Sequence, residues 1–124
     1  MVASPVRGEL SWARSLLLSA DLAHTPGARQ QTCLLAARHG ADVLLSGRGR
    51  GGDRRAGRPI PEPAELWTRL AAELPAFAEW ASYFALLEGR RGLSERQSDD
   101  LLRDLSLFLD LVGQQLSRPR PERI

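Results

Sequence analysis

Residues 74–88 constrain the fold of this chain more than any other stretch. The chain contains three Trp, one Tyr and three Phe residues, and four of these seven aromatic side chains lie in this stretch. Offsets of three, four and seven residues place five apolar side chains on one side of a helix: Phe77, Trp80, Ala81, Phe84 and Leu87. Each buried aromatic side chain removes about 150–250 Å² from water. We therefore expect an aromatic helix on which the other helices pack, with Trp80 central to the core.

Apolar residues recur with helical spacing in four further segments, which predicts helices over residues of about 10–23, 26–45, 62–74 and 95–117. Pro after Thr25 and the capping box formed by Ser94 and Gln97 are typical helix starts. Gly40 costs about 1 kcal/mol in helix propensity, and we expect the close approach of another helix to compensate for it. The pattern predicts an all-α, five-helix antiparallel bundle that forms one domain over residues 1–124, with a loose lead-in at residues 1–8.

Residues 46–61 are rich in glycine and arginine and have no hydrophobic period, so they predict a flexible loop, and residues 118–124 predict a frayed tail. All 17 basic residues of the chain are arginine, and the net charge of +2 comes from these two segments, since the rest is mildly acidic. Flexible arginines bind phosphate backbones without sequence preference. The candidate nucleic-acid-binding residues are therefore Arg48, Arg50, Arg54, Arg55 and Arg58. A tolerated insertion in a GC-rich gene explains the loop equally well.

Leu107 and Leu111 lie opposite the predicted core face of the last helix. A single buried face does not account for them. We interpret the pair as a candidate homodimer contact, with scattered surface apolar residues as the alternative.

The sequence shows little that is typical of catalysis. His24 and His39 are isolated and Cys33 has no second thiol, so we predict neither a metal site nor a cofactor. Asp99 and Asp100 diverge by about 100° on a helix, and we expect each to pair with an arginine four residues away. No apolar run reaches the roughly 18–20 residues of a membrane span, and the single cysteine fits a cytoplasmic protein.

Two stretches carry a family likeness, Leu66-Trp67 through Ala85 and Ser98 through Val112. They resemble a small actinobacterial family of the HEPN (higher eukaryotes and prokaryotes nucleotide-binding) superfamily, and the similarity spans most of residues 10–116. The resemblance implies an all-α bundle that is frequently dimeric. It also implies a superfamily that includes RNA-cutting toxins and non-catalytic modules that bind RNA or a protein partner.

According to this resemblance, the ribonuclease members use an arginine followed after four to six residues by a histidine. Arg29 is the natural arginine on the second helix, but Leu34, Leu35 and Ala36 stand where the histidine is expected. We therefore expect a non-catalytic HEPN-like module that binds a protein partner or RNA. Two alternatives stay open: a purely structural dimeric bundle, or a metal-independent ribonuclease with an unusual site built from Arg29, Arg38 and His39.

Overall fold

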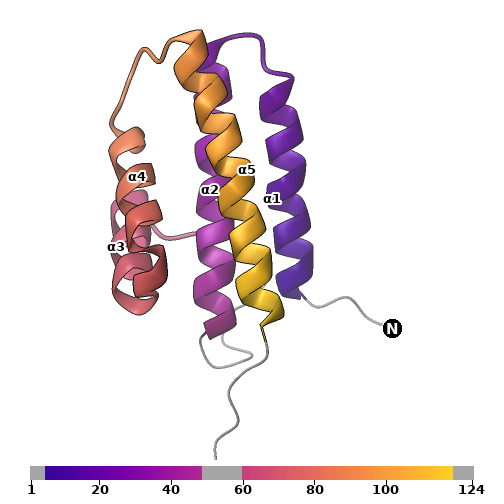
Figure 1. The fold of residues 1–124 in the computed structure, drawn as a ribbon, viewed down its shortest axis with the longest axis vertical. Helices are drawn as coiled ribbons and strands as arrows, with labels where there is room; N and C mark the ends of the chain where they lie inside the picture. The colour runs from indigo at the N-terminus through magenta and orange to yellow at the C-terminus, as the bar shows by residue number, and fades with distance from the viewer. Residues whose placement is uncertain (1–4, 49–59, 119–124) are drawn as a thin grey trace, which may run out of the picture.

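The computed structural model describes residues 5–48 and 60–118, and it confirms the prediction of an all-α protein with five helices (Figure 1). A single 3-10 turn, η1, precedes the fourth helix, and no strand occurs within the two described segments. The elements are α1 (Pro5–Asp21), α2 (Pro26–Arg48), α3 (Pro63–Glu73), η1 (Pro75–Phe77), α4 (Ala78–Glu88) and α5 (Glu95–Ser117).

Two helix boundaries differ from the sequence prediction. α1 begins at Pro5, inside the predicted lead-in, because the fixed φ of proline suits the first position of a helix. α2 continues to Arg48, three residues beyond the predicted end and into the segment assigned to the loop. Its predicted start is confirmed, since the backbone N–H of Ala28 donates to Oγ1 of Thr25 over 3.1 Å.

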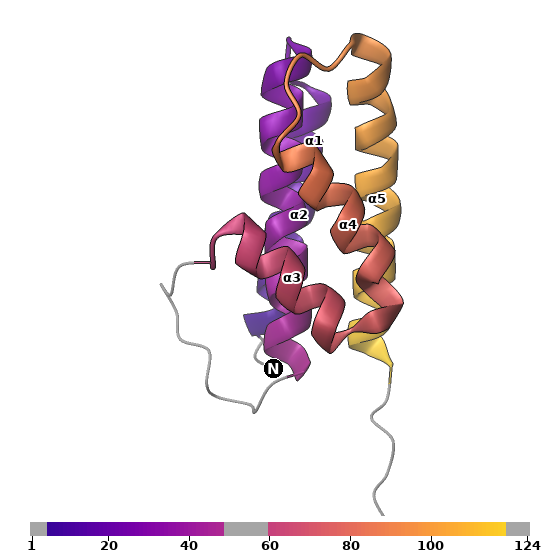
Figure 2. The same cartoon turned by 90° about the vertical axis from the view of Figure 1, so that its left-hand side faces the viewer.

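All four other helices pack on α2. α1 and α5 pack on one part of its surface, and α3 and α4 pack on another (Figures 1 and 2). α1 runs antiparallel to α2, whereas α5 runs parallel to α2, as the contacts of Arg29 with Ser98 and of Gly40 with Leu109 show. The parallel pair is the one departure from antiparallel packing among the three long helices.

Gly40 allows the close approach of α2 and α5. A Cβ atom at this position would lie 2.9 Å from Cδ2 of Leu109 and 3.2 Å from a ring carbon of Phe108. This confirms the predicted close packing at Gly40.

The aromatic side chains form a cluster between α3, α4 and α5. The ring centroid of Phe84 lies 4.9 Å from that of Phe108 and 5.2 Å from that of Trp67, and both Phe rings are fully buried. Trp80 lies at the edge of this cluster and is only partly buried. Phe84 and Phe108 therefore occupy the centre that we expected Trp80 to occupy.

Side-chain hydrogen bonds are also made at the start of α5 and at the C-terminal end of α4. The capping box of Ser94 and Gln97 is confirmed, with both reciprocal hydrogen bonds present. The buried amide of Gln30 donates to the carbonyl oxygens of Leu87 and Arg90 over 3.1 and 2.9 Å. These bonds connect α2 to the C-terminal end of α4 and to the turn that follows it.

Candidate functional site

Arg29, near the start of α2, connects the ends of three helices. Its guanidinium donates to Oγ of Ser98 over 3.1 Å, to Oδ1 of Asp99 over 2.6 Å and to the carbonyl oxygen of Ala23 over 3.2 Å. Only 14% of the Arg29 side chain is exposed, whereas 65% of the Asp99 side chain is. Asp99 thus pairs with an arginine of another helix and not, as expected, with Arg103, which instead contacts Asp100.

Arg38, farther along α2, faces the pair of helices α3 and α4. Its Nε and one terminal nitrogen donate to the two carboxylate oxygens of Glu88 over 2.9 and 2.6 Å. Nε1 of Trp67 donates to the same carboxylate over 3.0 Å. The hydrogen bonds to Glu88 raise the pKa of Arg38, so the guanidinium stays charged inside this partly buried network.

His39 lies on the side of α2 that faces α1. The centroid of its ring is 6.4 Å from that of Trp12, and the two rings meet edge to face. Neighbouring residues of a helix point about 100° apart, so His39 and Arg38 face different helices. Arg29 is nine residues from Arg38, a rise of about 13 Å. The structure therefore places the three residues of the alternative ribonuclease site in three separate sets of contacts.

The other residues predicted to be functional lie outside α2 or at its end. Arg48 is the last residue of α2, and Arg50, Arg54, Arg55 and Arg58 lie outside the described residues. Leu107 and Leu111 are 52% and 38% exposed on α5.

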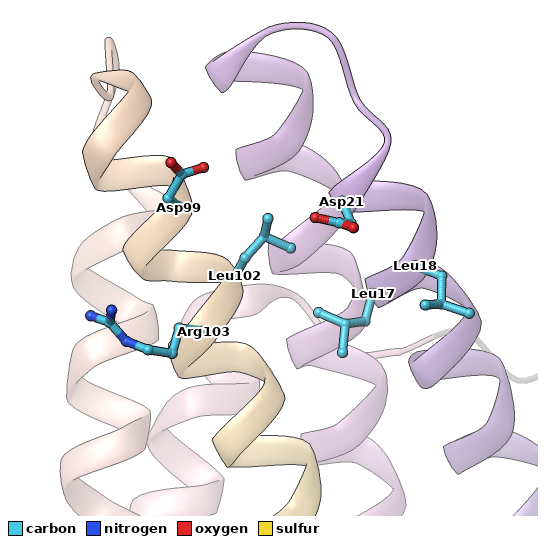
Figure 3. A pocket seen from close by; sticks show the side chains of 6 residues that line it. All are labelled: Leu17, Leu18, Asp21, Asp99, Leu102 and Arg103. Atoms are coloured by element: carbon cyan, nitrogen blue, oxygen red, sulfur yellow. The ribbon is translucent and has the colours of Figure 1, made fainter.

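The structure also contains a groove between α1 and α5 that the sequence did not predict (Figure 3). It has a volume of about 460 Å³ and lies between the last turns of α1 and the first turns of α5. Its lining residues are Leu17, Leu18, Asp21, Asp99, Leu102 and Arg103. Figure 3 shows Leu17 and Leu102 pointing toward each other across the groove, with Asp21 and Asp99 on its two sides. The sequence signal for this groove is Leu18, because this leucine lies off the face of α1 that buries Ala13 and Ala20.

Metal binding and thiol reactivity depend on where the His, Cys, Asp and Glu side chains lie within the described residues. In the part of the chain that the structure describes, no three His, Cys, Asp or Glu side chains gather as a metal site. Cys33 is fully buried, and burial raises the pKa of its thiol to about 12, which keeps it protonated at neutral pH. None of the helices in the described segments is both long and apolar enough to span a membrane.

Comparison with known proteins places the fold in a family. A family model described as SAV_6107-like HEPN matches residues 20–113, from the end of α1 to the last turns of α5. Neither a curated protein nor a solved structure matches the chain. The match covers more than half of the chain and confirms the resemblance found in the sequence. The protein therefore belongs to the SAV_6107-like family of the HEPN superfamily.

Proposed function

We propose that this chain is a non-catalytic HEPN module that acts by binding, and that it pairs with a second copy through α5. The observation that carries the proposal is the set of hydrogen bonds made by Arg29 and Arg38 of α2. Arg29 donates to Ser98, Asp99 and Ala23, and Arg38 donates to both oxygens of Glu88. A phosphate would compete with these charge-assisted bonds for either guanidinium. The arrangement argues against RNA cleavage at these two arginines, and a binding role is the proposal that remains.

The exposed leucines of α5 support self-association. Leu107 and Leu111 are one helical turn apart on the side of α5 away from the buried Phe108, Leu109 and Val112. Two-fold symmetry would bring the same apolar strip of both copies together and remove it from water.

Light scattering tests the homodimer. We expect twice the chain mass of 13.7 kDa for the wild type and a folded monomer for Leu107→Glu with Leu111→Glu, because two carboxylates would have to be buried in the interface. Leu86→Glu is the matched control: this leucine is 65% exposed on α4, and its replacement should leave the dimer intact. A wild-type monomer at tens of micromolar would contradict the proposed dimer.

An RNA assay tests the proposed absence of catalysis. Incubation with single-stranded RNA should produce no cleavage for the wild type or for His39→Ala. Any RNA binding should come from the arginines of residues 48–58 and fall steeply with salt, so deletion of residues 49–58 should abolish most of it. Cleavage that is lost in His39→Ala would instead establish the ribonuclease alternative.

A further inference from the structure

α1 and α5 contact each other; α2 packs on one side of this pair, and the groove lies on the other side. Both helices pack on α2, which occupies the inner side of the pair (Figure 1). At one end the pair is closed: Arg14 donates to the carbonyl oxygen of Leu109 over 3.2 Å and pairs with Asp110 over 3.2 Å. At the other end the groove opens on the outer side, with Leu17 and Leu102 on its floor (Figure 3). The groove is therefore formed by two helices, with apolar side chains where the helices meet.

The apolar surface continues from the groove onto α1. Leu18 lines the groove, and Leu22 lies one turn beyond it just after the end of α1. Leu22 is 75% exposed and Leu18 is 67% exposed, the highest values among the large apolar side chains of the described residues. An apolar patch of this kind with a polar rim is typical of a protein interaction site.

The groove carries an excess of negative charge. Asp21 is exposed on the α1 side and forms no ion pair with any residue that the structure describes. Asp99 is largely exposed on the α5 side, although Arg29 holds one of its oxygens. The guanidinium of Arg103 contacts Asp100 and points away from the groove in Figure 3. A ligand of this groove is therefore expected to be cationic beside its apolar face.

We propose that the groove between α1 and α5 binds an amphipathic helix of a partner protein, with an arginine or lysine beside its aliphatic stripe. A helix suits this groove because packed helices lie about 8–10 Å apart, and α2 already packs against the same two helices on the inner side. Aliphatic residues at helical spacing would cover Leu17, Leu18, Leu22 and Leu102, and the cation would pair with Asp21. This surface shares no residue with the Leu107–Leu111 strip of the proposed dimer.

The probe is a synthetic helical peptide with leucines at i, i+3, i+4 and i+7 and arginines on both flanks, measured by fluorescence anisotropy. We expect saturable binding to the wild-type protein. Leu18→Ser with Leu22→Ser should weaken it about tenfold or more, since two leucines would lose their apolar contact with the peptide. Asp21→Asn should weaken binding of the arginine peptide severalfold. It should leave unchanged the binding of a peptide with glutamine in place of arginine. All three positions are exposed, so the variants should keep the wild-type melting temperature.

The control variant is Leu107→Ser with Leu111→Ser, which adds no charge beside the groove and should bind the peptide as the wild type does. This separates the groove from the homodimer, because either proposal can then fail alone. No binding to the wild type, or equal binding to the Leu18 and Leu22 double variant, would overturn the proposal. So would equal binding of the arginine peptide to Asp21→Asn. Conversion of the dimer to a monomer by the Leu18 and Leu22 changes would show that a second copy covers the groove.

Discussion

At the scale of single residues, Phe84 should contribute most to the aromatic cluster. Its ring is fully buried and contacts those of Trp67, Trp80, Tyr83 and Phe108. We predict that Phe84→Ala lowers the free energy of unfolding by about 3–5 kcal/mol, because it removes apolar contact and leaves a cavity. Trp80→Ala should cost less, since that side chain is partly exposed. Urea denaturation of both variants checks this, and a larger loss for Trp80→Ala would contradict it.

Glu88 should be more important for stability than the surface carboxylates. It accepts two hydrogen bonds from Arg38 and one from Trp67, and its side chain is only 15% exposed. Glu88→Gln keeps the shape of the side chain but leaves Arg38 without its counter-charge. We predict a loss of about 1–3 kcal/mol in the free energy of unfolding.

The matched control for Glu88 is Glu73→Gln. Glu73 pairs with Arg69 at i,i+4 spacing over 3.4 Å, and both side chains are more than 40% exposed. Exposed pairs of this kind contribute at most about 0.5 kcal/mol. Equal losses for the two glutamine variants in urea denaturation would show that the partly buried network has no special role.

At the scale of helices, Gly40 tests the contact between α2 and α5. Alanine gains about 1 kcal/mol in helix propensity over glycine. At Gly40, however, the new methyl group would lie 2.9 Å from the buried side chain of Leu109. We predict that Gly40→Ala destabilises the protein despite the gain in propensity. Gly27→Ala, in the first turn of α2 where no atom would contact the methyl group, should stabilise it. Thermal unfolding should shift in opposite directions, and a higher melting temperature for Gly40→Ala would be inconsistent with close packing.

At the scale of the whole molecule, stability should fall at alkaline pH. Burial raises the pKa of the Cys33 thiol from 9.0 to about 12. Between these values the native thiol keeps its proton while the unfolded thiol has lost it, so the native state binds more protons. The free energy of unfolding therefore decreases with rising pH in this window, by about 1.4 kcal/mol per unit for one such group. Burial and the hydrogen bond to Asp104 also raise the pKa of Tyr83, which adds a loss of the same sign.

Melting temperatures at pH 7 and pH 10 check the alkaline loss. Cys33→Ala should lower the melting temperature at pH 7, because it leaves a small cavity, but should reduce the difference between the two pH values. Tyr83→Phe should reduce that difference less, because its unfolded phenol titrates near 10. A wild-type protein equally stable at both pH values would refute this prediction.

The local features of the fold were predictable from the sequence. The five helices follow from apolar periodicity, the start of α5 from the Ser94 and Gln97 capping box, and the close packing at Gly40 from the small residues around it. Each of these signals acts within a few residues of the chain. A helix repeats every 3.6 residues, so the sequence shows which face of a helix is buried.

Only the tertiary structure decided which faces meet. Asp99 pairs with Arg29, 70 residues away along the chain, and Arg38 pairs with Glu88 across 50 residues. The groove between α1 and α5 likewise combines Leu17 with Leu102. Periodicity assigns a side chain to a face but not to a neighbour, because many pairings of apolar faces bury similar areas. The choice among them depends on how side chains from distant segments fit together, as Gly40 fits against Leu109.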